Sequence, residues 1–241
     1  MRINTNTSVG DIVKVNFKTA QIFEKNSIDF CCGGLISLGE ACNIANVDVD
    51  QLIPELELMV MIDDPDSKYI DGLELNELCD YIEKRHHSYV NETMPFLQEK
   101  LHKLCDVHGD HHPELLEVRE LFDGAAENLS KHLKKEELLL FPYIRKMVKY
   151  KREDLHGKNE FGDAGETIKE MNEEHQTEGE RFVKMSTLTS SYTCPPDGCS
   201  TFQVTYQTLK DFENDLHRHI HLENNILFKK ALILENKLLN R

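Results

Sequence analysis

One pattern of histidine, glutamate and phenylalanine occurs twice in this chain of 241 residues and constrains its fold more than any other feature. The two copies are His132–Phe141 and His219–Phe228. In each copy glutamate follows the first histidine by four residues, and phenylalanine follows it by nine. Residues four apart lie on one face of an α-helix, one turn apart. The repeat therefore predicts two helices that present the same histidine–carboxylate pair.

Apolar residues continue the helix face that carries each pair, so both pairs are expected to point into the protein interior. Single histidines, His86 and His175, precede the two copies at similar distances. A metal ion removes the cost of burying a carboxylate. Four imidazoles and two carboxylates suit iron or manganese better than structural zinc, and the carboxylates could bridge two metals. The predicted metal ligands are His86, His132, Glu136, His175, His219 and Glu223.

The other histidines are not expected to bind metal. Those that fall off the inner helix stripe are expected at the surface, and they are His87, His217 and His221. Those in or near loops are expected to be solvated, and they are His102, His108, His111, His112 and His156.

Residues 73–241 have the periodicity of long amphipathic helices. Apolar residues recur at helical spacing over about 73–104, 114–149, 164–189 and 201–238, and strand signals are scarce. Loops of short or medium length separate these segments. The pattern predicts an all-α protein whose main domain is an up-down four-helix bundle.

Residues 1–62 are predicted to form a small helical N-terminal domain. Residues 63–72 are predicted to be a linker, because Asp63–Ser67 is acidic, polar and interrupted by proline. The domain contains the turn Asp29–Gly34, in which Cys31 and Cys32 are adjacent and two glycines follow. Adjacent cysteines do not easily form a relaxed disulfide with each other.

The glycines are expected to leave the thiols of Cys31 and Cys32 accessible, and a nearby helix N-terminus would lower a thiol pKa. Iron handover, redox exchange and partner docking all fit such a turn. The alternative is that both cysteines are small core residues. Cys194 and Cys199 flank a second turn and could approach each other, but a functional disulfide is not expected there.

Composition limits the partners and the compartment. The formal net charge of −15 would repel nucleic acid. No apolar run reaches the length of a membrane span, and the N-terminus lacks the features of a signal peptide. We therefore expect a cytoplasmic protein with no nucleic-acid or membrane partner. In that compartment the seven cysteines should mostly be free thiols.

The combination of motifs resembles the RIC (repair of iron centres) family, which joins a small N-terminal domain to a hemerythrin-like bundle. The resemblance covers nearly the whole chain. The residues that carry it are the turn Asp29–Gly34, His86, His132, Glu136, Glu174, His175, His219, Glu223, Asn224 and Asn225.

The resemblance implies a pair of non-haem iron ions, which an oxo group can bridge, held by four histidines and two bridging carboxylates. His87 directly follows His86, which leaves the register of the first helix open by one residue. The family's spacing from Tyr81 and Ile82 favours His86.

The resemblance also implies a bacterial cytoplasmic homodimer, induced by oxidative or nitrosative stress, that acts on damaged iron–sulfur proteins. It favours iron donation to damaged clusters. One alternative is an enzyme that reduces nitric oxide to nitrous oxide. Another is a binder or sensor of O2 or nitric oxide. Whether the protein is an enzyme stays open at this stage.

Overall fold

The computed structural model describes residues 1–154 and 164–240, and within them the chain is helical without a β-strand. An isolated β-bridge pairs Ser8 with Ser37. No helix in the described ranges is long and apolar enough to cross a membrane. The chain divides into two compact units, one made of residues 1–79, 144–165 and 220–241 and the other of residues 80–143 and 166–219. The predicted position of His156 lies outside the described residues.

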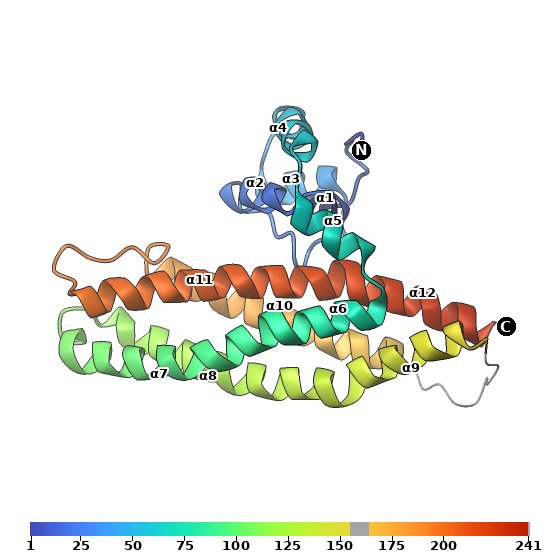
Figure 1. Ribbon diagram of the computed structural model, residues 1–241. Helices are drawn as coiled ribbons and strands as arrows, with labels where there is room; N and C mark the ends of the chain where they lie inside the picture. The colour runs from blue at the N-terminus through green and yellow to red at the C-terminus, as the bar shows by residue number, and fades with distance from the viewer. Residues whose placement is uncertain (155–163, 241) are drawn as a thin grey trace. The chain divides into compact units, whose positions relative to one another are not determined.

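The four long helices that the periodicity predicts are present, and each of three of them continues through a short π-helical turn. In chain order the elements are α6 (Leu75–Ile82), η2 (Glu83–His87), α7 (Ser88–His108), α8 (Glu114–Lys135), η3 (Glu136–Leu140), α9 (Phe141–Arg152), α10 (Ala164–Leu188), α11 (Ser200–Leu222), η4 (Glu223–Leu227) and α12 (Phe228–Leu239). In the second unit α7, α8, α10 and α11 lie side by side (Figure 1).

Aromatic side chains form the core of the second unit. Phe122, Phe182 and Phe212 come from three different helices and are all fully buried. The ring centroid of Phe212 lies 5.6 Å from that of Phe122 and 5.7 Å from that of Phe182. Burial of large rings at helical spacing is what holds such helices together.

The turns η2, η3 and η4 each carry a hydrogen bond between residues five apart. A π-turn adds one residue to a helix and rotates the side chains that follow relative to a regular α-helix. η3 and η4 begin at the predicted ligands Glu136 and Glu223, and η2 contains the predicted ligand His86. A ligand register counted on a regular helix can therefore be wrong by one residue.

Short helices make up the first part of the other unit. They are α1 (Val9–Val15), η1 (Phe17–Thr19), α2 (Ala20–Lys25), α3 (Leu38–Ala45), α4 (Val49–Met61) and α5 (Pro65–Gly72). Ile12, Phe23, Leu38 and Leu56 are fully buried and form their core.

The predicted linker contains α5 and is therefore not the flexible polar segment that its composition suggests. Pro65 stands at the start of the helix, where its missing N–H is not needed. The carboxylate of Asp64 accepts hydrogen bonds from the backbone N–H of Phe17 at 3.2 Å and from the hydroxyl of Ser67 at 2.7 Å. These buried contacts order the segment. The domain boundaries at residues 62 and 72 stay a prediction.

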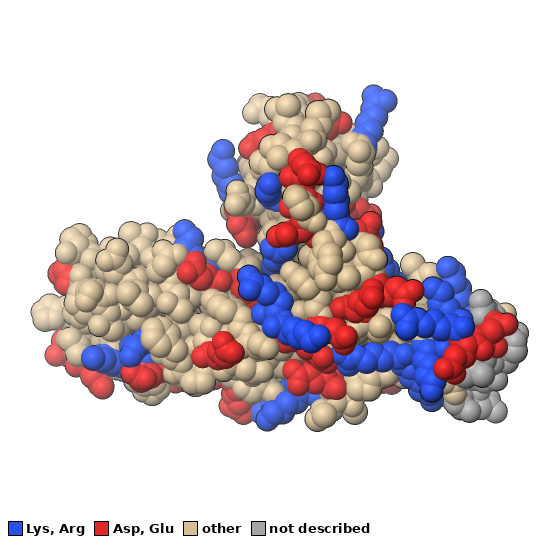
Figure 2. Space-filling model, viewed as in Figure 1, with Lys and Arg blue, Asp and Glu red and all other residues tan. Residues whose placement is uncertain are grey.

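Charged side chains of both signs are interspersed on the face shown in Figure 2. In the first unit Arg152 forms an ion pair with Glu74. The carboxylate of Asp71 lies 2.9 Å from Nζ of Lys14 and 3.5 Å from Nζ of Lys230. The negative net charge therefore does not make this face uniformly acidic.

Candidate metal centre

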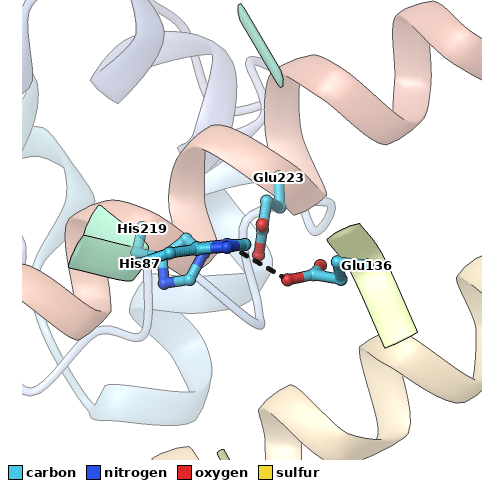
Figure 3. A group of neighbouring side chains, drawn as sticks. All are labelled: His87, Glu136, His219 and Glu223. Carbon is cyan, nitrogen blue, oxygen red and sulfur yellow. Dashed lines mark ion pairs between the residues drawn. The ribbon is translucent and has the colours of Figure 1, made fainter. Parts of the chain in front are cut away.

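Buried histidine and glutamate side chains form two overlapping groups in the described residues, and within each group the ligand atoms lie within 4.8 Å of one another. The members are His87, Glu136, His219 and Glu223 in one group, and His132, Glu136, His175 and Glu223 in the other. In Figure 3 the imidazoles and carboxylates of the first group point toward one another. Glu223 follows His219 by one turn on a continuous helix.

The carboxylate of Glu136 belongs to both groups and is fully buried. Its Oε2 lies 3.4 Å from Nε2 of His87, and its Oε1 lies 3.5 Å from Nε2 of His132. Each oxygen thus faces a different histidine. A carboxylate in this position can supply one oxygen to each of two cations.

Two carboxylates outside the groups orient the histidine rings. Nδ1 of His132 lies 2.6 Å from Glu174, and Nδ1 of His87 lies 2.8 Å from Glu137. The hydrogen bond from His132, followed by that from Lys135, lowers the pKa of Glu174 to about 2, so this carboxylate is a charged acceptor. A histidine that donates from Nδ1 presents the lone pair of Nε2 to a metal.

The surroundings of His132 agree with the tautomer that carries its proton on Nδ1. Its Nε2 lies 2.9 Å from Nε2 of His175, and both rings are buried. Two imidazole nitrogens that converge on a buried carboxylate form a donor set that fits a divalent or trivalent cation. The residues present therefore fit the metal that the sequence predicts.

The structure places His87, and not the predicted His86, in the ligand groups, and which of the two binds metal stays a prediction. His86 belongs to neither group; its Nδ1 lies 3.0 Å from Asp215, and its ring stacks on that of His219 with centroids 5.5 Å apart. His87, expected at the surface, is only 1% exposed and belongs to the first group. The physical reason is the π-turn η2, which ends at His87 and shifts the register within this helix.

The remaining predicted ligands all lie in the two groups, and they are His132, Glu136, His175, His219 and Glu223. His221 was expected at the surface but is buried, with its ring against Phe17 and Phe30. Among the loop histidines, His102 and His111 are exposed as expected, whereas His108 and His112 are half-buried.

Asp29 organises the Cys-Cys-Gly-Gly turn. Its Oδ1 accepts hydrogen bonds from the backbone N–H groups of Cys31 and Cys32, and its Oδ2 accepts one from Gly33, all at 2.9 Å. The Sγ of Cys31 lies 3.3 Å from Asp29 and 3.9 Å from Sγ of Cys32, so both thiols are free. Asp29, Cys31 and Cys32 form a third group of potential ligands.

The expectation of two accessible, activated thiols is wrong for Cys31. Its side chain is only 5% exposed, whereas Cys32 is half-buried. The hydrogen bond with Cys32 and burial raise the pKa of Cys31 well above the ordinary thiol value.

Asn224 and Asn225, which directly follow Glu223, bind this turn. The amide of Asn225 donates to the carbonyl oxygens of Phe30 at 3.2 Å and Cys31 at 3.1 Å, and that of Asn224 donates to Cys31 at 3.3 Å. A side chain on Gly34 would lie 2.5 Å from Oδ1 of Asn225, so glycine is required there. Sequence reasoning missed this contact, although two amides within an apolar helix were a signal for it.

The fold and the buried groups define a helical protein with a cation-binding site. Residues 80–231 match the family model described as the hemerythrin HHE cation binding domain. Residues 5–59 match a second family, ScdA_N, described as a domain of unknown function.

Relatives with similar sequences cover almost the whole chain. The iron-sulfur cluster repair protein ScdA of Staphylococcus haemolyticus is 31% identical over 230 residues, which are 95% of this chain and 99% of that protein. ScdA of Staphylococcus epidermidis is 32% identical over 92% of this chain and 96% of its own length. The iron-sulfur cluster repair protein YtfE of Yersinia pseudotuberculosis is 31% identical over 94% of this chain and 97% of its own length. The chain belongs to this RIC family of hemerythrin-domain proteins.

Proposed function

We propose that this chain is a di-iron protein that repairs iron–sulfur clusters damaged by oxidative or nitrosative stress by supplying iron to them. The names of the relatives support cluster repair. The position of Glu136 carries the two-ion part of the proposal, because its two oxygens face histidines of different groups.

The proposed ligands are the members of the two groups. His87 and His219 would hold one ion, His132 and His175 the other, with Glu136 and Glu223 shared between them. Imidazole and carboxylate suit iron in both common oxidation states. When bound, the pair supplies exchangeable iron and one-electron redox chemistry.

The chain's own residues keep the ligands ready for a cation. Glu137 and Glu174 hold the Nδ1 protons of His87 and His132, so that each Nε2 stays directed at Glu136. A preorganised site of this kind binds a cation without first reorienting its rings.

Asp29, Cys31 and Cys32 are proposed to accept iron on its way to a damaged protein. This group offers soft thiolates, whereas the bundle offers imidazole and carboxylate, so the two sites differ in chemistry. Similarity to the RIC family supports a homodimer as the working form.

The test is anaerobic loading of the full chain with ferrous iron, followed by incubation with an apo iron–sulfur protein. The wild type should hold two magnetically coupled irons and restore the cluster. Glu136→Gln should lose the coupling and the repair, whereas Glu127→Gln, a change at an exposed carboxylate on the same helix, should keep both. Saturation at one iron would overturn the two-ion site. Many turnovers of nitrous oxide from nitric oxide without iron transfer would replace iron donation by nitric oxide reduction.

A further inference from the structure

Two cysteines and a histidine form a cluster whose members belong to none of the ligand groups above. Cys199 is exposed and immediately precedes α11, and His108 is the last residue of α7. Nε2 of His108 lies 3.3 Å from Sγ of Cys199. Cys194 stands half-buried at the other end of the turn that leads to Cys199.

We propose that Cys199 is a peroxide-reactive thiolate and that Cys194 resolves its oxidised form as a disulfide. The proposal rests on the contact of Cys199 with His108, its exposure to solvent and the position of Cys194 within the same turn.

The surroundings of Cys199 favour its ionised form. Its carbonyl oxygen accepts the N–H of Gln203 at 3.0 Å, as expected of the residue that caps a helix. The backbone N–H of Phe202, then the ring of His108 and the N–H of Thr201, lower the pKa of Cys199 to about 7. Thiolates at helix N-termini beside histidine are the reactive form of cysteine.

Packing holds the His108 ring in place. It lies edge-on to Phe202, with centroids 5.5 Å apart, and the His112 ring packs on Phe202 in the same way at 5.4 Å. The His112 ring is itself held by two carboxylates: its Nε2 lies 3.2 Å from Asp197, and its Nδ1 lies 3.1 Å from Glu114. His108 is therefore positioned to stabilise the thiolate and to give a proton to a leaving group.

Cys194 differs from Cys199 in the way that a resolving thiol should. Burial, then the nearby Cys199, raises its pKa, so it stays protonated while Cys199 ionises. The N–H of Gly198 donates to the carbonyl of Pro195 at 2.9 Å and closes the turn. A Cβ on Gly198 would lie 2.5 Å from Sγ of Cys194, so this glycine makes room for the thiol next to Cys199.

The chemistry balances with hydrogen peroxide as the oxidant. The thiolate sulfur of Cys199 attacks one peroxide oxygen, the O–O bond breaks, and the hydroxide released becomes water with a proton from His108 or solvent. Cys199 is then a sulfenic acid. Cys194 loses its proton and attacks that sulfur, the S–O bond breaks, and a second water leaves. Two thiols are oxidised and one peroxide is reduced to two waters.

The test treats the full chain with one equivalent of hydrogen peroxide and maps the products by mass spectrometry. The peptide that contains both cysteines should lose two hydrogens and regain them with a dithiol reductant. Cys194→Ser should stop at a sulfenic acid that dimedone traps on Cys199. In Cys199→Ser, Cys194 should stay reduced, which separates direct reaction from iron-driven radical damage.

A second measurement tests the role of His108 without peroxide. The rate of alkylation of Cys199 by iodoacetamide at pH 7 should fall several-fold in His108→Gln and stay unchanged in His111→Gln, a change at an exposed neighbour. An unreacted Cys199 peptide after peroxide, or equal alkylation in both histidine variants, would overturn the proposal. So would stoichiometric Zn²⁺ binding that protects both thiols and is lost in His108→Gln, because it would make this cluster a metal site.

Discussion

The side-chain amide of Asn225 donates a hydrogen bond to the backbone carbonyl of Cys31 at 3.1 Å, across 194 residues of sequence. The donor stands two residues after Glu223, and the acceptor lies in the Cys-Cys turn. The segment that carries a proposed metal ligand therefore also holds the turn that carries the proposed iron-accepting thiols.

Replacing Asn225 should destabilise the fold. In Asn225→Ala the carbonyls of Phe30 and Cys31 lose a buried donor, which costs about 1–3 kcal/mol of unfolding free energy. Chemical denaturation measures this loss, and amide hydrogen exchange should be faster in the turn Asp29–Gly34. The exposed Asn236→Ala should stay within about 0.5 kcal/mol of wild type. Equal stability of the two variants would show that the amide does not hold the turn.

The histidine register of the first helix can be tested by iron content. His87→Leu should lose iron or its magnetic coupling, because Nε2 of His87 faces Glu136. His86→Leu should retain both irons, since His86 belongs to neither group. Iron analysis and Mössbauer spectra of the two variants decide the point. The reverse result would restore the register that motif spacing favours.

Glu174 should matter for metal retention although it is not a proposed ligand. Glu174→Gln removes the charged acceptor of the Nδ1 proton of His132, and such changes typically weaken metal binding about 10–100-fold. Competition with a chelator measures the affinity. The neighbouring Glu173→Gln changes an exposed carboxylate and should have no effect. A similar affinity for both variants would mean that the orientation of the His132 ring does not depend on Glu174.

The loop contact between His112 and Asp197 should make stability depend on pH. Burial opposes protonation of His112, but its hydrogen bonds to Asp197 and Glu114 outweigh burial and raise its pKa. Because the folded pKa is raised, the stabilisation is complete below the unfolded value of about 6.5 and is lost as pH rises through the folded pKa. The stability difference between wild type and Asp197→Asn should therefore shrink from pH 6 to pH 8.5. Urea denaturation at both values measures it, and a constant difference would contradict this contact.

The sequence by itself determined the four long helices and five of the six members of the two ligand groups. The reason is that spacings of three, four and seven residues are properties of a single helix, readable without knowledge of its neighbours. A repeated histidine–glutamate pair on an apolar face therefore indicates a buried site before any packing is known. The residue types alone also limited the cation to one that accepts imidazole and carboxylate.

Tertiary structure decided the rest. His87 rather than His86 lies in the ligand groups, at the end of the π-turn η2, which the periodicity of a regular helix does not predict. Cys31 is buried, and its backbone carbonyl is bound by Asn224 and Asn225, which lie more than 190 residues further along the chain. The pairing of Cys199 with His108 likewise joins residues 91 apart. Contacts of this kind follow from packing, and spacing along a single helix does not determine their partners.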